Sequence, residues 1–512
     1  MMPAFPPRRP TPARALPILI GVLLSLTACK TRPAELATTV DGAHSGLQSE
    51  VPGLLAAPAP AEAAPAIEPA EATAGDFAPA DTLGLADRIE VQDRFADREK
   101  LPAGTFVEMV RSAVLDHPRW GSGGAEAEVA GFAADEARAG LFPQINAGVS
   151  GSLSQFSNTR SDLSGTSRSK GFEEDADLYV RARQLIFDAG ATFDRIAQSE
   201  AERAAGKLTQ EATGTDLAVE AISSYYEVLA FTMLVELGEE HLGNLHQLEE
   251  MVDARRAGGG GDLGDLAEVR AARANAETRH VALRRRLSDA RNRFREMFGH
   301  EAASPLPWPD VYAAVPATRE DAMSMAVATH PALSAAREKI RAGSLGLSAT
   351  EAERRPGLHL EVDGARYDLA SDPVDGVTMR LVGTVKLYDG GVSNAREGRA
   401  AALLRKARFD ELATRRVIER RTGAAFDALQ LLEDEARAAE SALGATAASR
   451  IATKERFQAV GGNLLNVLNA EVDAHGAAVA WVEVMANREI ARFRLLEAAG
   501  GLASLFGLEV TQ

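Results

Sequence analysis

The sequence predicts a mixed α+β membrane protein built from two tandem repeats, each containing a β-strand pair and a long α-helical hairpin. First, proline is absent from 144–304 and from 374–512, and these tracts are rich in Ala, Leu, Glu and Arg, which favours uninterrupted helices. Second, several motifs occur twice at a constant displacement along the chain. Third, four segments of about ten residues alternate apolar and polar side chains, as strands do that have lipid on one face and water on the other.

Residues 1–28 are interpreted as a lipoprotein signal peptide. Arginines precede an apolar run over 15–26 that is too short to span a bilayer, and the run closes just before Cys29. This junction resembles the lipobox of bacterial lipoproteins, which implies an acylated Cys29, and Lys30 favours the outer membrane. The alternative is a buried structural thiol. Residues 29–95 are rich in Ala and Pro and lack a sustained apolar period, so we expect a disordered linker there.

Composition and motifs exclude several classes of function. The 512 residues include 56 Lys and Arg against 73 Asp and Glu, and the net charge of -17 argues against nucleic acid as a partner. A single cysteine excludes an intrachain disulfide framework and a cysteine-based zinc site. No phosphate loop, nucleophile elbow or HExxH sequence occurs, and His241 and His246 do not share a helix face. We therefore expect no enzyme activity, no cofactor and no metal.

The two predicted repeats span 104–304 and 318–508. One set of markers recurs 213 residues later: His117, Pro118 and Pro143 as His330, Pro331 and Pro356. A second set recurs 201 residues later: the segments 187–190 and 261–266 as 388–391 and 462–467. Independent markers that share two offsets are poorly explained by chance, so we infer an internal duplication.

A strand pair is expected in each repeat, between its second proline and an Asp-x-Gly corner. The strands are predicted at 145–154 and 178–187, then at 358–367 and 377–387, with hairpin loops at 155–176 and 368–376. A length of about ten residues suits a tilted strand that crosses a bilayer. The alternative is two soluble hairpins half-buried on a core, which would show the same alternation.

A very long helix follows each corner and turns back at a glycine-rich tip. The first is expected over 191–256, ends in the run from Gly258 to Gly261, and returns over 265–298. The second is expected over 393–459, ends at Gly461 and Gly462, and returns over 465–498. Four strands per chain leave two open edges, which hydrocarbon does not tolerate, so two or three chains must close a barrel together.

This order of elements, in tandem, resembles the TolC-like outer-membrane efflux proteins. The likeness rests on the stretches 184–190 and 385–391 together with the glycine tips. The strand-to-helix corners in those stretches are formed by Asp188, Gly190, Asp389, Gly390 and Gly391. The resemblance implies a homotrimer whose twelve-stranded β-barrel, set in outer-membrane lipid, continues into an α-helical periplasmic barrel. It also implies a passive exit duct that works with a periplasmic adaptor protein and an inner-membrane pump.

The hairpin tips of that family close the tunnel, and acidic side chains just after the second tip constrict it. The matching positions here hold Asn466 and Asn469, whereas Asp265 and Glu268 occupy the equivalent positions of the first repeat. In three chains these carboxylates would form a ring near the aperture that attracts cations. The alternative is that Asp265 caps the helix beginning there and Glu268 favours its N-terminal dipole, and both can hold at once.

Two questions about function stay open at the level of the sequence. The duct could serve a multidrug efflux pump or a type I secretion system, because the pump selects most of the exported substrate. A different class is a non-conducting periplasmic coiled-coil lipoprotein that acts as an envelope spacer or scaffold. β-structure in detergent and conductance in planar bilayers separate the duct from the spacer.

Overall fold

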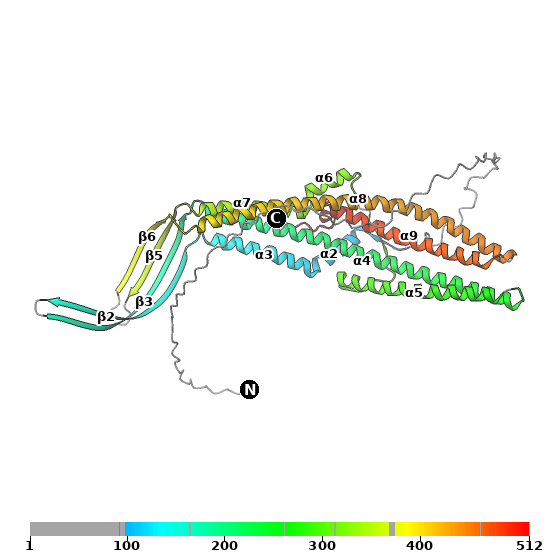
Figure 1. The fold of residues 1–512 in the computed structure, drawn as a ribbon, viewed down its shortest axis with the longest axis horizontal. Helices are drawn as coiled ribbons and strands as arrows, with labels where there is room; N and C mark the ends of the chain where they lie inside the picture. Colours follow the sequence, from blue (N-terminus) through cyan, green and yellow to red (C-terminus); the bar gives the residue numbers. More distant parts are fainter. Residues whose placement is uncertain are drawn as a thin grey trace, which may run out of the picture. The chain divides into compact units, whose positions relative to one another are not determined.

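A computed structural model describes residues 92, 98–162, 165–260, 262–311, 314–367, 374–460 and 462–510, all within the unit Pro79–Gln512. Cys29, the predicted signal peptide and, apart from Gln92, the predicted linker at 29–95 lie outside these residues. Figure 1 shows the described elements coloured along the chain from blue to red.

Both halves of this unit have the same order of elements. The first half contains α2 (Ala103–Asp116), α3 (Pro118–Ala139), β2 (Gln144–Asp162), β3 (Gly165–Phe187), α4 (Ala191–Ala257) and α5 (Leu263–Phe298). The second half contains α6 (Arg319–Thr329), α7 (Pro331–Ala352), β5 (Gly357–Tyr367), β6 (Val374–Thr384), α8 (Val392–Val460) and α9 (Leu464–Ala498). The short strands β1 (Lys100–Pro102) and β4 (Trp308–Asp310) pair in parallel, and the helix α10 (Leu502–Phe506) follows α9.

One antiparallel sheet joins the two halves, with its strands in the order β2-β3-β5-β6. Across this sheet, Ile145 lies opposite Ala182, Ala182 opposite Val362, and Val362 opposite Met379. Because side chains alternate between faces, this register places most of the apolar residues of the four strands on one face. Figure 1 shows the sheet at one end of the long helices and the tips of both hairpins at the other.

The strands β2 and β3 extend well beyond the predicted segments. The predicted hairpin loop at 155–176 is wrong, because the antiparallel ladder continues until Asp162 pairs with Gly165. The Ser, Gly and Asn content of this stretch indicates turns, but a ladder needs only backbone donors and acceptors. In the second pair, β6 begins at Val374 inside the predicted loop and ends at Thr384, so 385–387 are not strand. Residues 368–373 lie outside the described part of the chain.

The long helices have nearly the predicted bounds, with no end displaced by more than two residues. Their proline-free sequences leave every internal N–H available for the i to i-4 hydrogen bond. The shorter helices α3 and α7 begin at equivalent turns. In those turns, the Nδ1 atoms of His117 and His330 accept hydrogen bonds from the backbone N–H groups of Arg119 and Ala332, each at 3.2 Å. Both histidines are therefore part of helix starts.

The main core surrounds the middle of α4. Phe106, Tyr225, Tyr226 and Phe493 are fully buried there, with ring centroids 5.2 to 6.3 Å apart. Among the described helices, α4 alone contains a window long and apolar enough to cross a membrane, but 61% of that window is buried by its neighbours. Its apolar character is thus explained by packing within the helical bundle.

Candidate functional site

The apolar face of the sheet is exposed in a single chain. Val149, Val377, Met379 and Leu381 expose between 64% and 81% of their surface. Contiguous large aliphatic side chains of this kind need an apolar neighbour, because water does not accommodate them on a soluble surface. At the end of this face farthest from the helices, Arg366 and Asp375 pair across the strands at 3.3 Å. The ion pair marks the limit of the apolar band.

The opposite face of the sheet carries a ladder of ion pairs. The carboxylate of Asp363 accepts hydrogen bonds from the guanidinium groups of Arg181 and Arg380, each at 2.6 Å. Glu361 lies 3.8 Å from Arg183 and 3.7 Å from Arg380. Such pairs form where charged side chains stay hydrated. This face is therefore suited to water, and its arginines are largely matched by acids.

A single aspartate organises each strand-to-helix corner. The carboxylate of Asp188 accepts hydrogen bonds from the backbone N–H groups of Gly190 at 3.1 Å and Thr192 at 2.7 Å. The matching acceptor in the second half is Asp389, with donors Gly391 at 3.1 Å and Ser393 at 2.9 Å. Each carboxylate thus satisfies N–H groups that have no partner inside the following helix. The hydrogen bonds from Ser393 hold the pKa of Asp389 below its ordinary value.

The corner glycines are required by the backbone. Gly190 and Gly391, at matching positions, have φ of 92° and 90°. Only glycine adopts such values without a steric penalty. The preceding position has φ of 58° at Ala189 and 69° at Gly390, closer to the left-handed well that other residues can reach. The two corners therefore differ in sequence but not in conformation.

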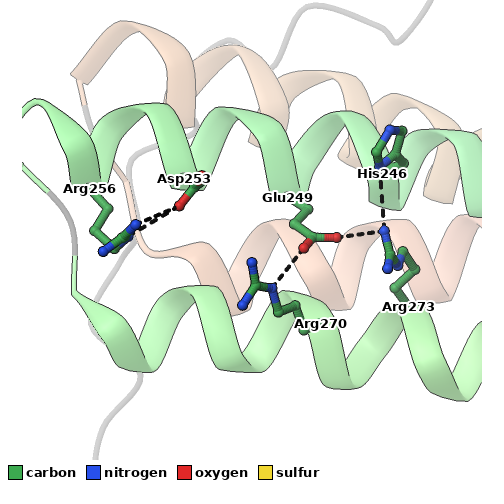
Figure 2. Close-up of polar contacts among 6 residues, drawn as sticks. All are labelled: His246, Glu249, Asp253, Arg256, Arg270 and Arg273. Atoms are coloured by element: carbon green, nitrogen blue, oxygen red, sulfur yellow. Dashed lines mark hydrogen bonds and ion pairs between the residues drawn. The ribbon is translucent and has the colours of Figure 1, made fainter.

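The first hairpin tip, between α4 and α5, is fixed by a charged clamp (Figure 2). Glu249 on α4 accepts from Arg270 and lies against Arg273, both on α5 and both at 2.8 Å. Arg273 also approaches His246 Nδ1 at 3.5 Å. The side chain of Glu249 is only 14% exposed, and the hydrogen bond from Arg270 lowers its pKa. One carboxylate thus ties the two helices together near their turn.

The second hairpin tip, between α8 and α9, has neutral amides instead. Asn463 caps α9 by accepting from the backbone N–H of Leu465 at 2.8 Å. Asn466 and Asn469 are exposed and line a polar groove of about 270 Å³ between the two helices, together with Arg456. The groove can offer both donors and acceptors at this tip.

The predicted aperture residues lie in the first two turns of the return helices. Asp265 is half-buried and Glu268 is exposed on α5, at positions that match Asn466 and Asn469 on α9. The interpretation that Asp265 caps α5 is wrong, because this helix begins at Leu263 and Asp262 occupies the N-cap. Asp265 stands instead within the first turn, where its charge complements the helix dipole.

The glycines at the tips are placed differently from one another. Gly258 is the C-cap of α4, and the positive φ of 80° belongs to Gly259, which the sequence pattern did not single out. Gly462 lies beside Phe457, where an added Cβ would be 3.7 Å from the Cα of that residue. Gly261 and Gly461 lie outside the described residues.

A shared apolar cluster joins the two tips of one chain. It combines residues of all four long helices: Leu245, Leu248, Val252, Leu266, Val269, Ala276, Phe457, Leu464, Val467 and Leu468. Arg255 of α4 lies over the ring of Phe457 of α8 at 5.4 Å. The tips are therefore packed against each other, a contact that no local sequence pattern predicts.

Farther from the tips, a buried polar layer separates this cluster from the main core. His241 of α4 stacks on His475 of α9, with ring centroids 4.3 Å apart and planes 6° from parallel. Burial lowers the pKa of His241 to about 4 and also lowers that of His475. Glu471, which is 4% exposed, lies 3.9 Å from Arg450. The helix periodicity of α9 could have placed His475 on the buried face, but not its partner.

The described residues offer no metal centre: no group of three or more His, Cys, Asp or Glu side chains could hold an ion. His241 is buried in the bundle, whereas His246 reaches the surface beside Glu250 at 3.5 Å.

Comparisons with known proteins agree with this arrangement. Residues 117–300 match the family model described as outer membrane efflux protein. The chain is 22% identical over 338 residues to the outer membrane efflux protein BepC of Brucella suis biovar 1 (strain 1330), an alignment that covers 65% of this chain and 74% of that protein. The predicted resemblance is thus confirmed.

Solved structures share the fold. The outer membrane protein VceC of Vibrio cholerae superposes with a TM-score of 0.67 at 17% identity, covering 78% of this chain and 96% of that one. The CmeC outer membrane channel of Campylobacter jejuni gives a TM-score of 0.68 at 14% identity, covering 78% of this chain and 86% of that one. At these identities the likeness concerns the fold.

Proposed function

We propose that this chain, which belongs to the TolC-like outer-membrane efflux proteins, is one third of a homotrimeric exit duct through the outer membrane. The duct would be passive and would supply only a path. In this proposal the two repeats, 104–304 and 318–508, each contribute two strands to a shared β-barrel and one hairpin to a periplasmic α-helical barrel.

One observation carries the proposal: a continuous apolar face runs across four hydrogen-bonded strands whose edges, β2 and β6, are open. A face of exposed Val, Met and Leu fits hydrocarbon, and the paired arginines of the other face fit water. Open edges are not tolerated in hydrocarbon, so β6 of one chain would pair with β2 of the next. Three chains would give twelve strands, within the range of known barrels.

The aperture is assigned to the hairpin tips. Asp265 and Glu268 would contribute six carboxylates in a trimer, beside the neutral amides of Asn466 and Asn469. Like charges around a narrow opening favour cations and invite block by divalent cations. Gly258, Gly261, Gly461 and Gly462 would let each helix pair turn at this end.

The remaining assignments follow from the same picture. Cys29 is proposed as the lipidated residue that anchors the chain to the outer membrane, with 1–28 removed and 29–95 a disordered linker. A periplasmic adaptor protein would join the tips to an inner-membrane pump that supplies the energy. Efflux of small molecules and type I protein secretion are both compatible with such a duct.

Conductance and crosslinking test the proposal. Purified protein in planar bilayers is expected to form cation-selective channels, and Asp265→Asn with Glu268→Gln is expected to reduce that selectivity several-fold. In a Cys29→Ser background, cysteines on the edge strands at Ser150 and Thr378 are expected to crosslink into a covalent trimer. The matched control pairs Tyr179 with Ala365, which face each other within one chain and should give only monomer.

The spacer alternative predicts the opposite results. A non-conducting coiled-coil lipoprotein would raise no current and would leave the edge cysteines unlinked. The exposed aliphatic face speaks against it, because such a spacer has no need of a lipid-compatible sheet.

A further inference from the structure

We propose that the polar face of the sheet, where it meets the helices, contains a binding site for small amphipathic anions. The site rests on the proposed duct in one respect, namely that this face would line the conduit. A cavity of about 400 Å³ lies at this junction, a volume typical of small-molecule sites. It is lined by residues of all four strands of the sheet together with the ends of α3 and α7 and the start of α4.

The cavity is cationic although the whole chain is acidic. Arg183, Arg195, Arg355 and Lys386 line it, against the carboxylates of Asp188 and Glu353. With histidine neutral, these side chains carry two net positive charges, whereas the chain as a whole carries -17. The sign of the local charge is therefore opposite to that of the whole chain.

Both carboxylates already have partners. Asp188 accepts the hydrogen bonds that build the first corner. Glu353 pairs with Arg195 and lies 4.0 Å from Arg396. Neither acid is free to neutralise the other cations of the cavity, so an anion from solution would meet little competition.

Arg355 and Lys386 are the cations that remain available. Both are exposed, and within the described residues neither side chain makes a hydrogen bond or an ion pair. The charge of Lys386 is felt by Asp389, whose pKa it helps to lower. A guanidinium can bind a carboxylate, sulfonate or phosphate through two hydrogen bonds, and an ammonium adds a second positive charge. The N-terminus of α4 in the same wall favours negative charge as well.

The wall also has apolar parts, which define the rest of the ligand. Phe142, Leu185 and Ala352 line the cavity, and Phe142 is 66% exposed. A ligand that places an anionic group between Arg355 and Lys386 can lay an aromatic or aliphatic body against these side chains. The class is thus an organic anion with an apolar body.

The ligand is assigned to dissolved solutes rather than lipid headgroups. Arg183, His359 and Thr384 have the parity of the polar face, whereas bilayer lipid would contact the opposite face. Anions that pass along the conduit would meet this cavity once in every chain.

Direct binding tests the site. The trisulfonated dye 8-hydroxypyrene-1,3,6-trisulfonate is titrated with the purified full chain in an uncharged detergent at low salt, and fluorescence anisotropy is measured. Arg355→Ala combined with Lys386→Ala is expected to weaken binding about tenfold, and added salt should shrink that difference. Arg405→Ala, which removes an exposed cation of α8 outside the cavity, is the matched control and should bind as the unaltered chain does. Circular dichroism checks that all variants fold.

The outcomes separate this site from the duct. Unchanged binding by the double variant, or equal weakening by the control, overturns the site even if the channel conducts. Loss of binding in the double variant supports the site even if no current is seen, in which case the duct fails instead. In nanodiscs, phosphatidylglycerol can be tested as a competitor of the dye. If this lipid competes with the dye in the unaltered chain but not in the double variant, the cavity is assigned to lipid and the solute proposal is overturned.

Discussion

The two hairpin tips share a backbone plan and differ in what holds them together. The α4–α5 tip is closed by Glu249 between two arginines. The α8–α9 tip has exposed amides and packs against the first tip through Phe457. Charge-assisted hydrogen bonds are roughly twice as strong as those between neutral groups. The difference teaches that two copies of one fold can be held together by different kinds of contact. We expect the second tip to move more readily.

Removing the ring of Phe457 should have the largest effect on the contact between the two tips. Phe457 is 8% exposed in the shared apolar cluster, and Phe457→Ala is expected to destabilise the tip by about 3 kcal/mol through the cavity that it leaves. Hydrogen exchange should accelerate around 450–475 and much less around 245–270. Phe409→Ala, at a site on α8 that is 69% exposed, is the control. Equal loosening of both tips would contradict the contrast between them.

Acid should weaken the contact between the hairpins at the stacked histidines. His241 has a folded pKa of about 4, below its ordinary value, so between pH 6.5 and 4 the unfolded chain binds protons that the folded chain excludes. The stabilisation is therefore complete above pH 6.5 and declines as the pH falls toward 4, by an amount on the order of 2 kcal/mol. Thermal unfolding across this range measures it.

A variant separates the contribution of His241 from that of a buried carboxylate, whose effect on stability changes with pH in the opposite direction. Burial raises the pKa of Glu497 to about 7, so its contribution is present at low pH and is lost as the pH rises from 4.5 to 7. His241→Gln should remove the His241 part of the profile and leave the parts that come from Glu497 and from His330, whose pKa burial also lowers to about 4. His246→Gln, on the surface, should leave the whole profile unchanged, and a similar flattening there would refute the assignment.

Alanine substitutions at the glycines of the second corner should lower stability by smaller and unequal amounts. Gly391→Ala is expected to cost about 1 to 2 kcal/mol, because φ of 90° is strained for any side chain. Gly390→Ala should cost less, about 1 kcal/mol or below, since Ala189 already occupies the matching position at φ of 58°. Urea denaturation in detergent compares the two variants. A larger loss for Gly390→Ala would show that the corners are not equivalent.

The charged clamp should give the smallest effect because its members are partly hydrated. Glu249→Gln removes the anion between Arg270 and Arg273 and should raise amide exchange a few-fold near the first tip, bringing it toward the second. High salt should mimic the variant by screening. The folded pKa of Glu249 is lowered, so the clamp is present above pH 4.5 and is lost as the pH falls through the lower folded value. Asp253→Asn is the matched acidic control.

Local patterns in the sequence determined the helices, the corners and the sheet faces. The ends of α4, α5, α8 and α9 follow from proline-free tracts and glycine tips, and strand alternation separates the two faces. These features depend on residues a few positions apart, so short-range sterics and periodicity fix them. The composition of 155–176 is typical of turns and predicted a loop, but backbone pairing makes this stretch part of the β2–β3 ladder.

Tertiary structure alone decided which distant residues meet. The structure was needed to identify the β3–β5 pairing between the halves and the partners of Glu249. It was also needed to identify the stack of His241 on His475 and the cationic cavity at the sheet–helix junction. A helix face or strand face read from the sequence does not name the surface that will cover it. Partner choice depends on chain topology and on close packing of the whole bundle, and neither is encoded in a local pattern.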